Sequence, residues 1–334
     1  MGNLDCPFFL SKKTAMTPIV FLEVDTVTTG DLDINQFGIL KNAILLNSSD
    51  TDKLYDQYSN VEILVINKTE INSSILEDLP RLRFIQIIAT GYDNVDLAAC
   101  RDRGIEVCNV EGYSTYSVAQ HVFALILTLT NKVNYHWQMA RDGIWSNEPK
   151  FTFYTPGIPE LNQKKLGIIG MGAIGSAVAR VGKAFGMEIL TYTRSPEKIN
   201  DHTIRSVDLD ELARNSDIIS LHLPLNPETS QIIDQEFLSK MKSEALLINT
   251  ARGGLINEKA LASVLTLKGI KGAGLDVLSH EPPPNDHPLL TLPNCITTSH
   301  MAWATLDARR TLLHHTLENV ETFLRDGKVG HSLT

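Results

Sequence analysis

Short apolar runs rich in β-branched residues alternate along this chain with stretches long enough to form helices. Alternation of this kind predicts βαβ units, in which crossover helices join parallel strands. Five runs lie in the first third of the chain, at residues 19–24, 43–46, 63–66, 84–89 and 106–110. Six more form a second series, at residues 166–169, 188–193, 217–223, 245–250, 272–277 and 295–298. The sequence therefore predicts an α/β protein with two parallel sheets, and the six runs are those expected of a doubly wound nucleotide-binding sheet.

Length and charge narrow the class of protein further. At 334 residues the chain exceeds one ordinary core, so we expect two domains. The apolar fraction of 43% and the charged fraction of 21% are typical of a soluble globular protein. The formal charge of -9 offers no basic surface to phosphate backbones, and no apolar run reaches the length of a membrane span. We therefore expect neither nucleic acid nor a membrane as a partner.

The spacing of cysteines and histidines argues against disulfides and metal sites. No C-x-x-C pair and no secretory signal accompany the four cysteines, Cys6, Cys100, Cys108 and Cys295. Reduced thiols and a cytoplasmic location are the simplest interpretation. His314 and His315 are the only adjacent histidines, and a helix would point them in different directions, so we expect no metal.

Two long helices are also predicted. Residues 116–131 are apolar nearly all round, which is typical of a buried helix and suits a hinge between domains. After His300 the pattern becomes one amphipathic helix that we expect to return to the first domain. Its predicted apolar stripe consists of Leu306, Leu313, Leu317, Val320 and Leu324.

A glycine-rich motif joins the strand predicted at residues 166–169 to a helix. It consists of Gly170, Met171, Gly172, Ala173, Ile174 and Gly175. Glycines at these positions permit a tight turn and a close approach of a pyrophosphate, while the start of the helix supplies partial positive charge. The motif in this context predicts a dinucleotide site, and a glycine-rich turn without a ligand is the alternative.

The residues after the next predicted strand bear on the choice of dinucleotide. An adenosine ribose with free hydroxyls is usually bound by an acidic residue about 20 positions beyond the glycines. This chain has Thr193, Arg194 and Ser195 there, and a guanidinium with two hydroxyls suits a 2'-phosphate. NADP(H) is therefore favoured. In the alternative, Arg194 is a solvated cation, Glu197 binds the ribose, and NAD(H) is the cofactor.

Three polar side chains near the C-terminus each follow a strand of the second series. They are Arg252, Glu281 and His300, and all three can project from one carboxyl edge of the sheet, where such sheets bind ligands. A guanidinium offers a planar pair of donors to a carboxylate, and an imidazole beside a carboxylate exchanges protons near neutral pH. The combination predicts chemistry on 2-oxoacids and 2-hydroxyacids.

Several separate motifs resemble those of the D-isomer-specific 2-hydroxyacid dehydrogenases. They are the glycine motif, Asn249-Thr250-Ala251-Arg252-Gly253-Gly254, Gly274-Leu275-Asp276-Val277 with Glu281-Pro282, and Ser299-His300. Within this family, the resemblance is to the glycerate dehydrogenase or hydroxypyruvate reductase branch. The motifs that carry it are Gly91-Tyr92-Asp93-Asn94-Val95-Asp96, Asn109-Val110 with Gly112-Tyr113-Ser114-Thr115, Ser117-Val118-Ala119-Gln120-His121 and His300-Met301-Ala302-Trp303. The resemblance covers the chain from about Met16 to its end.

The resemblance implies a Rossmann-like lobe for the cofactor, a flavodoxin-like lobe for the substrate, and a homodimer formed mainly by the cofactor lobe. We place the dinucleotide-binding domain at residues 118–300 and the substrate domain at residues 16–117 and 301–334. Residues 1–15 are expected to be a flexible leader. The aromatic cluster at residues 151–154, together with Trp145, is expected to cover either the cleft or a subunit contact.

By position in the motifs, the resemblance also implies roles for residues. Arg252 would bind the substrate carboxylate and carbonyl, Glu281 would orient His300, and His300 would be the acid and base. Backbone amides around Thr90 and Gly91 would complete the carboxylate site. Trp303 and Tyr92 either line the pocket or belong to the core. Cofactor contacts are expected from Val118, Gly170, Gly172, Ala173, Ile174, Gly175, Thr193, Arg194, Ser195, Leu223, Pro224, Thr250, Ala251 and Asp276.

Some residues depart from the family or lack an assigned role. Thr193 replaces the usual Asp of the branch, which argues against an NAD preference, and Ala173 replaces a frequent Arg. We expect His121, His222 and His280 to serve in packing or support, since no acid partner is implied for them.

The expected activity is the reduction of hydroxypyruvate and glyoxylate to D-glycerate and glycolate with NAD(P)H. The same chemistry on a sugar-derived 2-oxoacid or an arylpyruvate is one alternative. A non-enzymatic NAD(P) sensor, similar to certain corepressors, is another.

Overall fold

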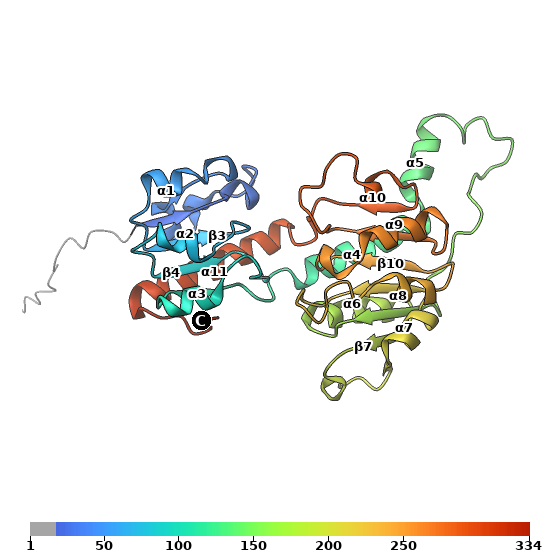
Figure 1. The fold of residues 1–334 in the computed structure, drawn as a ribbon. Helices are drawn as coiled ribbons and strands as arrows, with labels where there is room; N and C mark the ends of the chain where they lie inside the picture. Colours follow the sequence, from blue (N-terminus) through green and yellow to red (C-terminus); the bar gives the residue numbers. More distant parts are fainter. Residues whose placement is uncertain (1–17) are drawn as a thin grey trace, which may run out of the picture. The chain divides into compact units, whose positions relative to one another are not determined.

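A computed structural model describes residues 18–334, which divide into two compact units (Figure 1). The first unit comprises residues 18–110 with Leu312–Thr334, and the second comprises Glu111–Thr311. The expected boundaries lay at 117/118 and 300/301, a few residues away from these. They differ because helix α4 (Thr115–Asn131) packs along its length on the second unit and belongs wholly to it. The expected leader at residues 1–15, with Cys6, lies outside the described residues.

Among the described residues of the first unit, five parallel strands form one sheet in the order β2-β1-β3-β4-β5. The strands are β1 (Ile19–Phe21), β2 (Ile44–Leu45), β3 (Ile63–Ile66), β4 (Phe84–Ile87) and β5 (Glu106–Cys108). They coincide with the five predicted runs, and the order is that of flavodoxin-like sheets. The predicted α/β class and the flavodoxin-like lobe are therefore confirmed.

Helices cover both faces of this sheet, because its central strands β1, β3 and β4 are buried along their whole length and must be covered on both sides. One face packs on α1 (Lys53–Gln57), α2 (Ser73–Glu77) and α3 (Leu97–Asp102) through a cluster that includes Leu54, Leu76 and Cys100. The opposite face meets the end of α11 (Leu306–Asp326), where Phe323 stacks on Phe84 with ring centroids 4.7 Å apart.

The apolar stripe predicted for the last helix was partly wrong. Leu306 and Leu324 are each 37% exposed. The buried side of α11 is formed instead by Leu312, Leu313, Thr316, Val320 and Phe323. The buried face is rotated toward Thr316 because stacking of Phe323 on Phe84, and a 2.9 Å hydrogen bond from Asn319 Nδ2 to Gln86 Oε1, set the side that meets the sheet.

The second unit contains seven parallel strands among its described residues, in the order β12-β11-β10-β9-β6-β7-β8. They are β6 (Lys165–Ile169), β7 (Glu188–Tyr192), β8 (Ile204–Ser206), β9 (Ile218–Leu221), β10 (Leu246–Asn249), β11 (Gly272–Leu275) and β12 (Cys295–Thr297). Counted from β6, this is the 3-2-1-4-5-6 order of a Rossmann sheet with one strand added. The six expected strands are present, and the prediction missed β8. That strand has no apolar run, because it lies at the sheet edge and exposes Arg205 and Ser206.

Successive residues of these strands point to opposite faces, as the pleat requires. Ile168 and Ile218 pack with α4 and α6 (Ala173–Ala184), and the expected buried helix at residues 116–131 is thereby confirmed as α4. Ile169 and Ile219 pack on the other face. The helices of that face are α7 (Leu209–Asn215), α8 (Gln235–Lys240) and α9 (Glu258–Thr266).

The shorter elements complete the two units. The remaining α-helices are α5 (Val133–Arg141) and α10 (Pro288–Thr291). Single turns of 3-10 helix lie at η1 (Val24–Thr26), η2 (Ile34–Gln36), η3 (Gly38–Asn42), η4 (Ser48–Asp50), η5 (Pro196–Lys198) and η6 (Gly253–Leu255). Helix α5 and the segment after it, drawn in green, stand away from the rest of the second unit (Figure 1).

Candidate active site

The carboxyl edge of the second sheet gathers the three side chains singled out in the sequence. Arg252 follows β10, Glu281 lies in the loop after β11, and His300 follows β12. These strands are direct neighbours in the order β12-β11-β10. Because parallel strands end at a common edge, a sequence separation of 48 residues between Arg252 and His300 becomes a local arrangement.

Glu281 and His300 are in direct hydrogen-bonding contact. His300 Nδ1 lies 2.6 Å from Glu281 Oε2, and Glu281 Oε1 accepts a hydrogen bond from Leu278 N at 2.9 Å. The His300 side chain is 24% exposed and the Glu281 side chain is 33% exposed, so both can meet a ligand arriving from solvent. With Nδ1 directed at the carboxylate, Nε2 is the atom that can exchange a proton with a ligand.

The turn that presents His300 is strained and is held by Asp276. His300 has φ 53, a left-handed value that a non-glycine residue seldom adopts. Its N donates to Asp276 O at 2.8 Å, and the next two amides, Met301 N and Ala302 N, donate to the Asp276 carboxylate at 2.9 and 2.8 Å. Thr298 Oγ1 donates to the same carboxylate at 2.6 Å. The surrounding structure therefore maintains the strained conformation.

The Asp276 carboxylate is ionised although it is only 1% exposed. Burial acts to raise the pKa of Asp276, but hydrogen bonds from His121, Thr298 and the two backbone amides outweigh it and hold the pKa below its ordinary value. The sequence analysis assigned Asp276 to the cofactor. The described contacts direct both of its oxygens to the turn that carries His300.

His121 corrects one expectation, since it does have an acid partner. Its Nε2 lies 3.4 Å from Asp276 Oδ1 and 3.0 Å from Thr298 Oγ1. The partner follows a strand 155 residues away, which is why spacing alone could not reveal it. His222, in contrast, contacts Ser220 Oγ at 2.9 Å, and burial lowers the pKa of His222 to about 3, so it is neutral.

The Arg252 loop is fixed by Asn249 and by a close approach of two loops. Asn249 Nδ2 donates to Arg252 O at 2.8 Å, and Asn249 Oδ1 accepts from Ala251 N at 3.0 Å. Gly253 follows, and a Cβ there would lie 2.0 Å from the carbonyl carbon of Leu278. Only glycine allows this approach, which brings the Arg252 loop against the loop that carries Glu281.

Tyr113 is a neighbour of this site that the sequence analysis did not single out. Burial raises the pKa of Tyr113, while Ser114 and the positive charge of Arg252 act in the opposite direction. The Tyr113 ring also meets Trp303 edge-on, with centroids 6.4 Å apart. Trp303 is therefore packed against Tyr113, and the phenol is held neutral near Arg252. Tyr113 stood in a family-like motif, which was the only signal available.

The glycine motif has three distinct local environments. Gly170 has φ 99, which makes the tight turn after β6. A Cβ at Gly175 would lie 2.1 Å from Gly170 O, so this position is reserved for close packing of α6 on the turn. A Cβ at Gly172 would meet no atom within 4 Å, and Gly172 caps α6 without a side-chain hydrogen bond. Ala173 and Ile174 begin the helix, so this end of α6 fits a pyrophosphate.

The other expected cofactor residues lie at the same edge. Leu223 and Pro224 follow β9, and Val118 lies in α4 with 5% exposure. Thr250 and Ala251 follow β10, and Thr250 Oγ1 is buried without a hydrogen bond among the described residues. An unsatisfied hydroxyl at a strand end suits a ligand.

The residues after β7 are those expected to meet the adenosine end of the cofactor. Arg194 is mostly exposed, and its Nη1 is 3.8 Å from Glu228 Oε2. Ser195 N donates to Thr193 Oγ1 at 3.3 Å. Glu197, the alternative ribose acid, lies in the exposed turn η5.

Thr90 and Gly91 belong to the first unit, after β4. Thr90 Oγ1 donates to Val110 O at 3.1 Å, and Asn109 Nδ2 donates to Thr90 O at 2.7 Å. These bonds order the loop after β4. Tyr92, in the same loop, is 43% exposed and is not a core residue.

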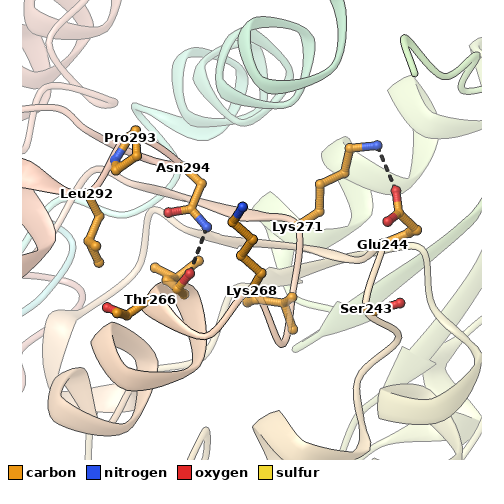
Figure 2. A pocket seen from close by; sticks show the side chains of 10 residues that line it. Ser243, Glu244, Thr266, Lys268, Lys271, Leu292, Pro293 and Asn294 are labelled. Atoms are coloured by element: carbon orange, nitrogen blue, oxygen red, sulfur yellow. Dashed lines mark hydrogen bonds and ion pairs between the residues drawn. The ribbon is translucent and has the colours of Figure 1, made fainter. Parts of the chain in front are cut away.

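A cavity of about 560 Å³ lies at the opposite edge of the second sheet (Figure 2). It is lined by residues that precede β10, β11 and β12, among them Glu244, Lys271 and Asn294. Lys271 Nζ pairs with Glu244 Oε2 at 3.0 Å. None of the expected site residues lines this cavity.

Residues 18–334 contain no group of three His, Cys, Asp or Glu side chains placed to hold a metal ion. Over the same residues, no helix is both long and apolar enough to cross a membrane.

Comparison with known proteins identifies the family. Residues 123–302 match the family model of the D-isomer specific 2-hydroxyacid dehydrogenase, NAD binding domain. The chain is 37% identical over 316 residues to a hydroxypyruvate reductase of Blautia hydrogenotrophica, covering 93% of this chain and 98% of the relative. It is 36% identical over 309 residues to a glycerate dehydrogenase of Methylorubrum extorquens, covering 92% and 96%.

A solved structure gives the same result for the fold and for the cofactor class. An acyclic imino acid reductase in complex with NADPH and D-Arg superposes with a TM-score of 0.81 at 32% identity, covering 95% of this chain and all of that one. A pyridine nucleotide is thus the cofactor class, and the chain belongs to the D-isomer-specific 2-hydroxyacid dehydrogenases, an NAD(P)-dependent oxidoreductase family.

Proposed function

We propose that this protein reduces hydroxypyruvate and glyoxylate to D-glycerate and glycolate with NAD(P)H. The observation that carries the proposal is the 2.6 Å contact between His300 Nδ1 and Glu281 Oε2, beside Arg252 on the neighbouring strand end. An acid and base next to a carboxylate-binding cation is what a small 2-oxoacid requires. The names of the relatives, hydroxypyruvate reductase and glycerate dehydrogenase, support this substrate class.

Each of the three side chains has a defined task in this mechanism. The Arg252 guanidinium binds the substrate carboxylate and orients the carbonyl. His300, as imidazolium, donates the Nε2 proton to the carbonyl oxygen. Glu281 stabilises the imidazolium and fixes its ring. The bound reduced nicotinamide supplies the hydride to C2. In oxidation of the 2-hydroxyacid, neutral His300 accepts the proton.

We also propose NADP(H) as the preferred cofactor. Support comes from Arg194 with the hydroxyls of Thr193 and Ser195 at the end of β7, where no carboxylate stands. Glu228 is the nearest described acid to Arg194 Nη1, at 3.8 Å, and both side chains are more than 70% exposed. An exposed pair of this kind is weak and would release Arg194 to a 2'-phosphate. Arg194→Ala should lower kcat/KM about ten- to hundred-fold with NADPH and change it little with NADH. Equal kinetics of the two enzymes with NADPH would favour NAD(H).

A homodimer in the cytoplasm completes the proposal. Its support is a group of exposed aromatic side chains on α5 and the segment after it, namely Tyr135, Trp137, Trp145, Phe151 and Tyr154. Phe151 is 91% exposed, and an apolar group of this size on a projecting segment suits a subunit contact. Sedimentation should give twice the 37.0 kDa mass of the chain, and Phe151→Ser with Tyr154→Ser should weaken the association. A monomeric wild type would refute this part.

The activity is tested by the loss of absorbance at 340 nm with NADPH or NADH and a panel of 2-oxoacids. Hydroxypyruvate and glyoxylate should be the best substrates. A higher kcat/KM for an arylpyruvate or a sugar-derived 2-oxoacid would move the assignment to that substrate. No turnover of any 2-oxoacid would favour a non-enzymatic nucleotide sensor.

A further inference from the structure

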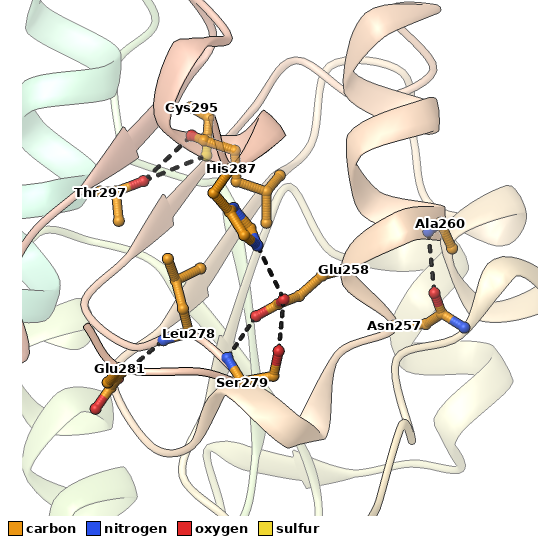
Figure 3. A network of polar contacts seen from close by, with 10 residues as sticks. Asn257, Glu258, Ala260, Leu278, Ser279, Glu281, His287, Cys295 and Thr297 are labelled. Carbon is orange, nitrogen blue, oxygen red and sulfur yellow. Dashed lines mark hydrogen bonds and ion pairs between the residues drawn. The ribbon is translucent and has the colours of Figure 1, made fainter. Parts of the chain in front are cut away.

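The loop that carries Glu281 is bound at both ends by a second glutamate from another element (Figure 3). Glu258 is the first residue of α9, whose N-cap is Asn257. Its Oε1 accepts a hydrogen bond from Ser279 N at 2.6 Å, and its Oε2 accepts one from Ser279 Oγ at 2.6 Å. Its Oε2 also lies 3.3 Å from Nε2 of His287, near the end of the same loop. Glu258 therefore ties the loop to α9 on either side of Glu281.

Two consecutive amides of this loop are bound by the two glutamates. Leu278 N donates to Glu281 Oε1 at 2.9 Å, and the next amide, Ser279 N, donates to Glu258 Oε1. The Ser279 N–H lies in the rigid peptide plane that joins Leu278 to Ser279, so fixing this plane limits the backbone torsions of Leu278, which direct the Leu278 N–H. The Leu278 amide in turn holds the carboxylate whose other oxygen meets His300. The contact between Glu281 and His300 is thus the last of a series of hydrogen bonds that starts at Glu258.

The same peptide also supports the Arg252 loop. A Cβ at Gly253 would lie 2.0 Å from the carbonyl carbon of Leu278 and 2.2 Å from Ser279 N. Gly253 directly follows Arg252, so a shift of this peptide would move both the guanidinium and the Glu281 carboxylate. The exposed fractions of the Glu258 and His287 side chains are only 15% and 16%, so water competes little with these bonds.

We propose that Glu258 is a positioning residue of the active site, which holds the peptide between Leu278 and Ser279 so that Glu281 presents its carboxylate to His300. The inference rests on the roles proposed above for Glu281 and His300. A competing role for Glu258 is that of a carboxylate at the start of α9, where negative charge stabilises a helix without affecting the site.

Three substitutions of Glu258 separate the two roles. Glu258→Ala removes both the charge and the hydrogen bonds. Glu258→Asp keeps the charge at the helix start, but its side chain is about 1.5 Å shorter and cannot reach Ser279. Glu258→Gln loses the charge, yet it retains an oxygen for Ser279 N and adds an amide group that can donate to Ser279 Oγ. Glu244→Ala is the matched control, because Glu244 pairs with Lys271 at the opposite edge of the sheet.

The direct measurement is the proton NMR signal of the His300 Nδ1–H in the full chain labelled with ¹⁵N-histidine. The signal is assigned by its absence in His300→Gln, and its dependence on the carboxylate is set by Glu281→Gln. We expect Glu258→Ala and Glu258→Asp to shift or broaden it, while Glu258→Gln and Glu244→Ala leave it as in the wild type. With hydroxypyruvate, kcat should fall about ten- to hundred-fold in the Ala and Asp variants, because the acid is displaced from its productive position.

The outcomes distinguish this inference from the proposed function. A wild-type chain that reduces no 2-oxoacid refutes the proposed function, while the NMR signal still decides the role of Glu258. A wild-type signal in Glu258→Asp overturns the inference, because charge at the helix start then suffices. A lost signal in Glu258→Gln overturns it as well, because the hydrogen bonds are retained there. If Glu258→Ala does not fold, the Asp and Gln variants decide.

Discussion

Replacing Glu281 by glutamine should lower the rate of reduction. Glu281→Gln keeps the size of the side chain and can still accept a hydrogen bond from Leu278 N, but it removes the negative charge 2.6 Å from His300 Nδ1. Reduction requires the imidazolium, and the carboxylate stabilises that charged form. Without the carboxylate the charged form loses this partner, so reduction should be slower.

The size of the loss in rate follows from the geometry of the pair. The two side chains are 24% and 33% exposed, which places the pair between a weak surface contact and a fully buried one. A hydrogen bond between charged groups contributes about 1.5 to 3 kcal/mol. Since about 1.4 kcal/mol corresponds to a factor of ten in rate, kcat/KM should fall about ten- to hundred-fold.

The assay is the measurement of kcat/KM for hydroxypyruvate with the wild type and Glu281→Gln under the same conditions. Oxidation of D-glycerate, which needs neutral His300, should lose less than reduction does in the variant. His300→Gln serves as the control, because a glutamine cannot supply the proton and should abolish the reaction. Equal kcat/KM in the wild type and Glu281→Gln would refute the role assigned to Glu281, even if His300 were essential.

Three further predictions concern the rest of the site. Arg252→Lys keeps the charge but loses the planar pair of donors, so kcat/KM should fall about ten- to hundred-fold and Arg252→Ala should be worse; wild-type kinetics in the latter would remove Arg252 from the site. Gly172→Ala should leave the Tm unchanged and weaken nucleotide binding in fluorescence titrations, whereas Gly175→Ala should lower the Tm, because its Cβ would lie 2.1 Å from Gly170 O. Equal effects of the two variants on the Tm would contradict the separate roles of these glycines. The pKa of Asp276 is held below its ordinary value of 3.8, so its carboxylate stabilises the fold above that pH and this contribution is lost as the pH falls through the lower folded value. The difference in Tm between wild type and Asp276→Asn should therefore shrink below about pH 4, and a difference independent of pH would show that the charge does not matter.

Local patterns were sufficient for the elements that are apolar throughout. The five strands of the first unit and six of the second were readable because each carries a short apolar run, as most strands of a sheet covered on both faces do. Strand β8 was not predicted, because Arg205 and Ser206 are exposed at the sheet edge and leave no apolar run. The face of α11 was misplaced because leucine spacing was weighed without knowledge of Phe84, the ring on which Phe323 stacks.

For the site, the sequence indicated which residues follow the strands but not how they are held. Arg252, Glu281 and His300 could be chosen because guanidinium, carboxylate and imidazole each stand directly after a predicted strand or in the loop that follows it. The partners that support them come from distant positions. Asp276 with His121, and Glu258 with Ser279, meet only after the strands assemble, so spacing along the chain carried no sign of them.

By itself, the sequence determined the α/β class, the glycine turn before α6 and the family, because these depend on apolar periodicity and on residue types that a local conformation requires. Tertiary structure decided the rest. The strand order β12-β11-β10 makes neighbours of Arg252, Glu281 and His300, and the missing side chain of Gly253 lets two loops touch. The left-handed turn at His300 persists because Asp276 binds the amides that follow it. Such contacts depend on distances between segments far apart in the chain, and those distances exist only in the folded protein.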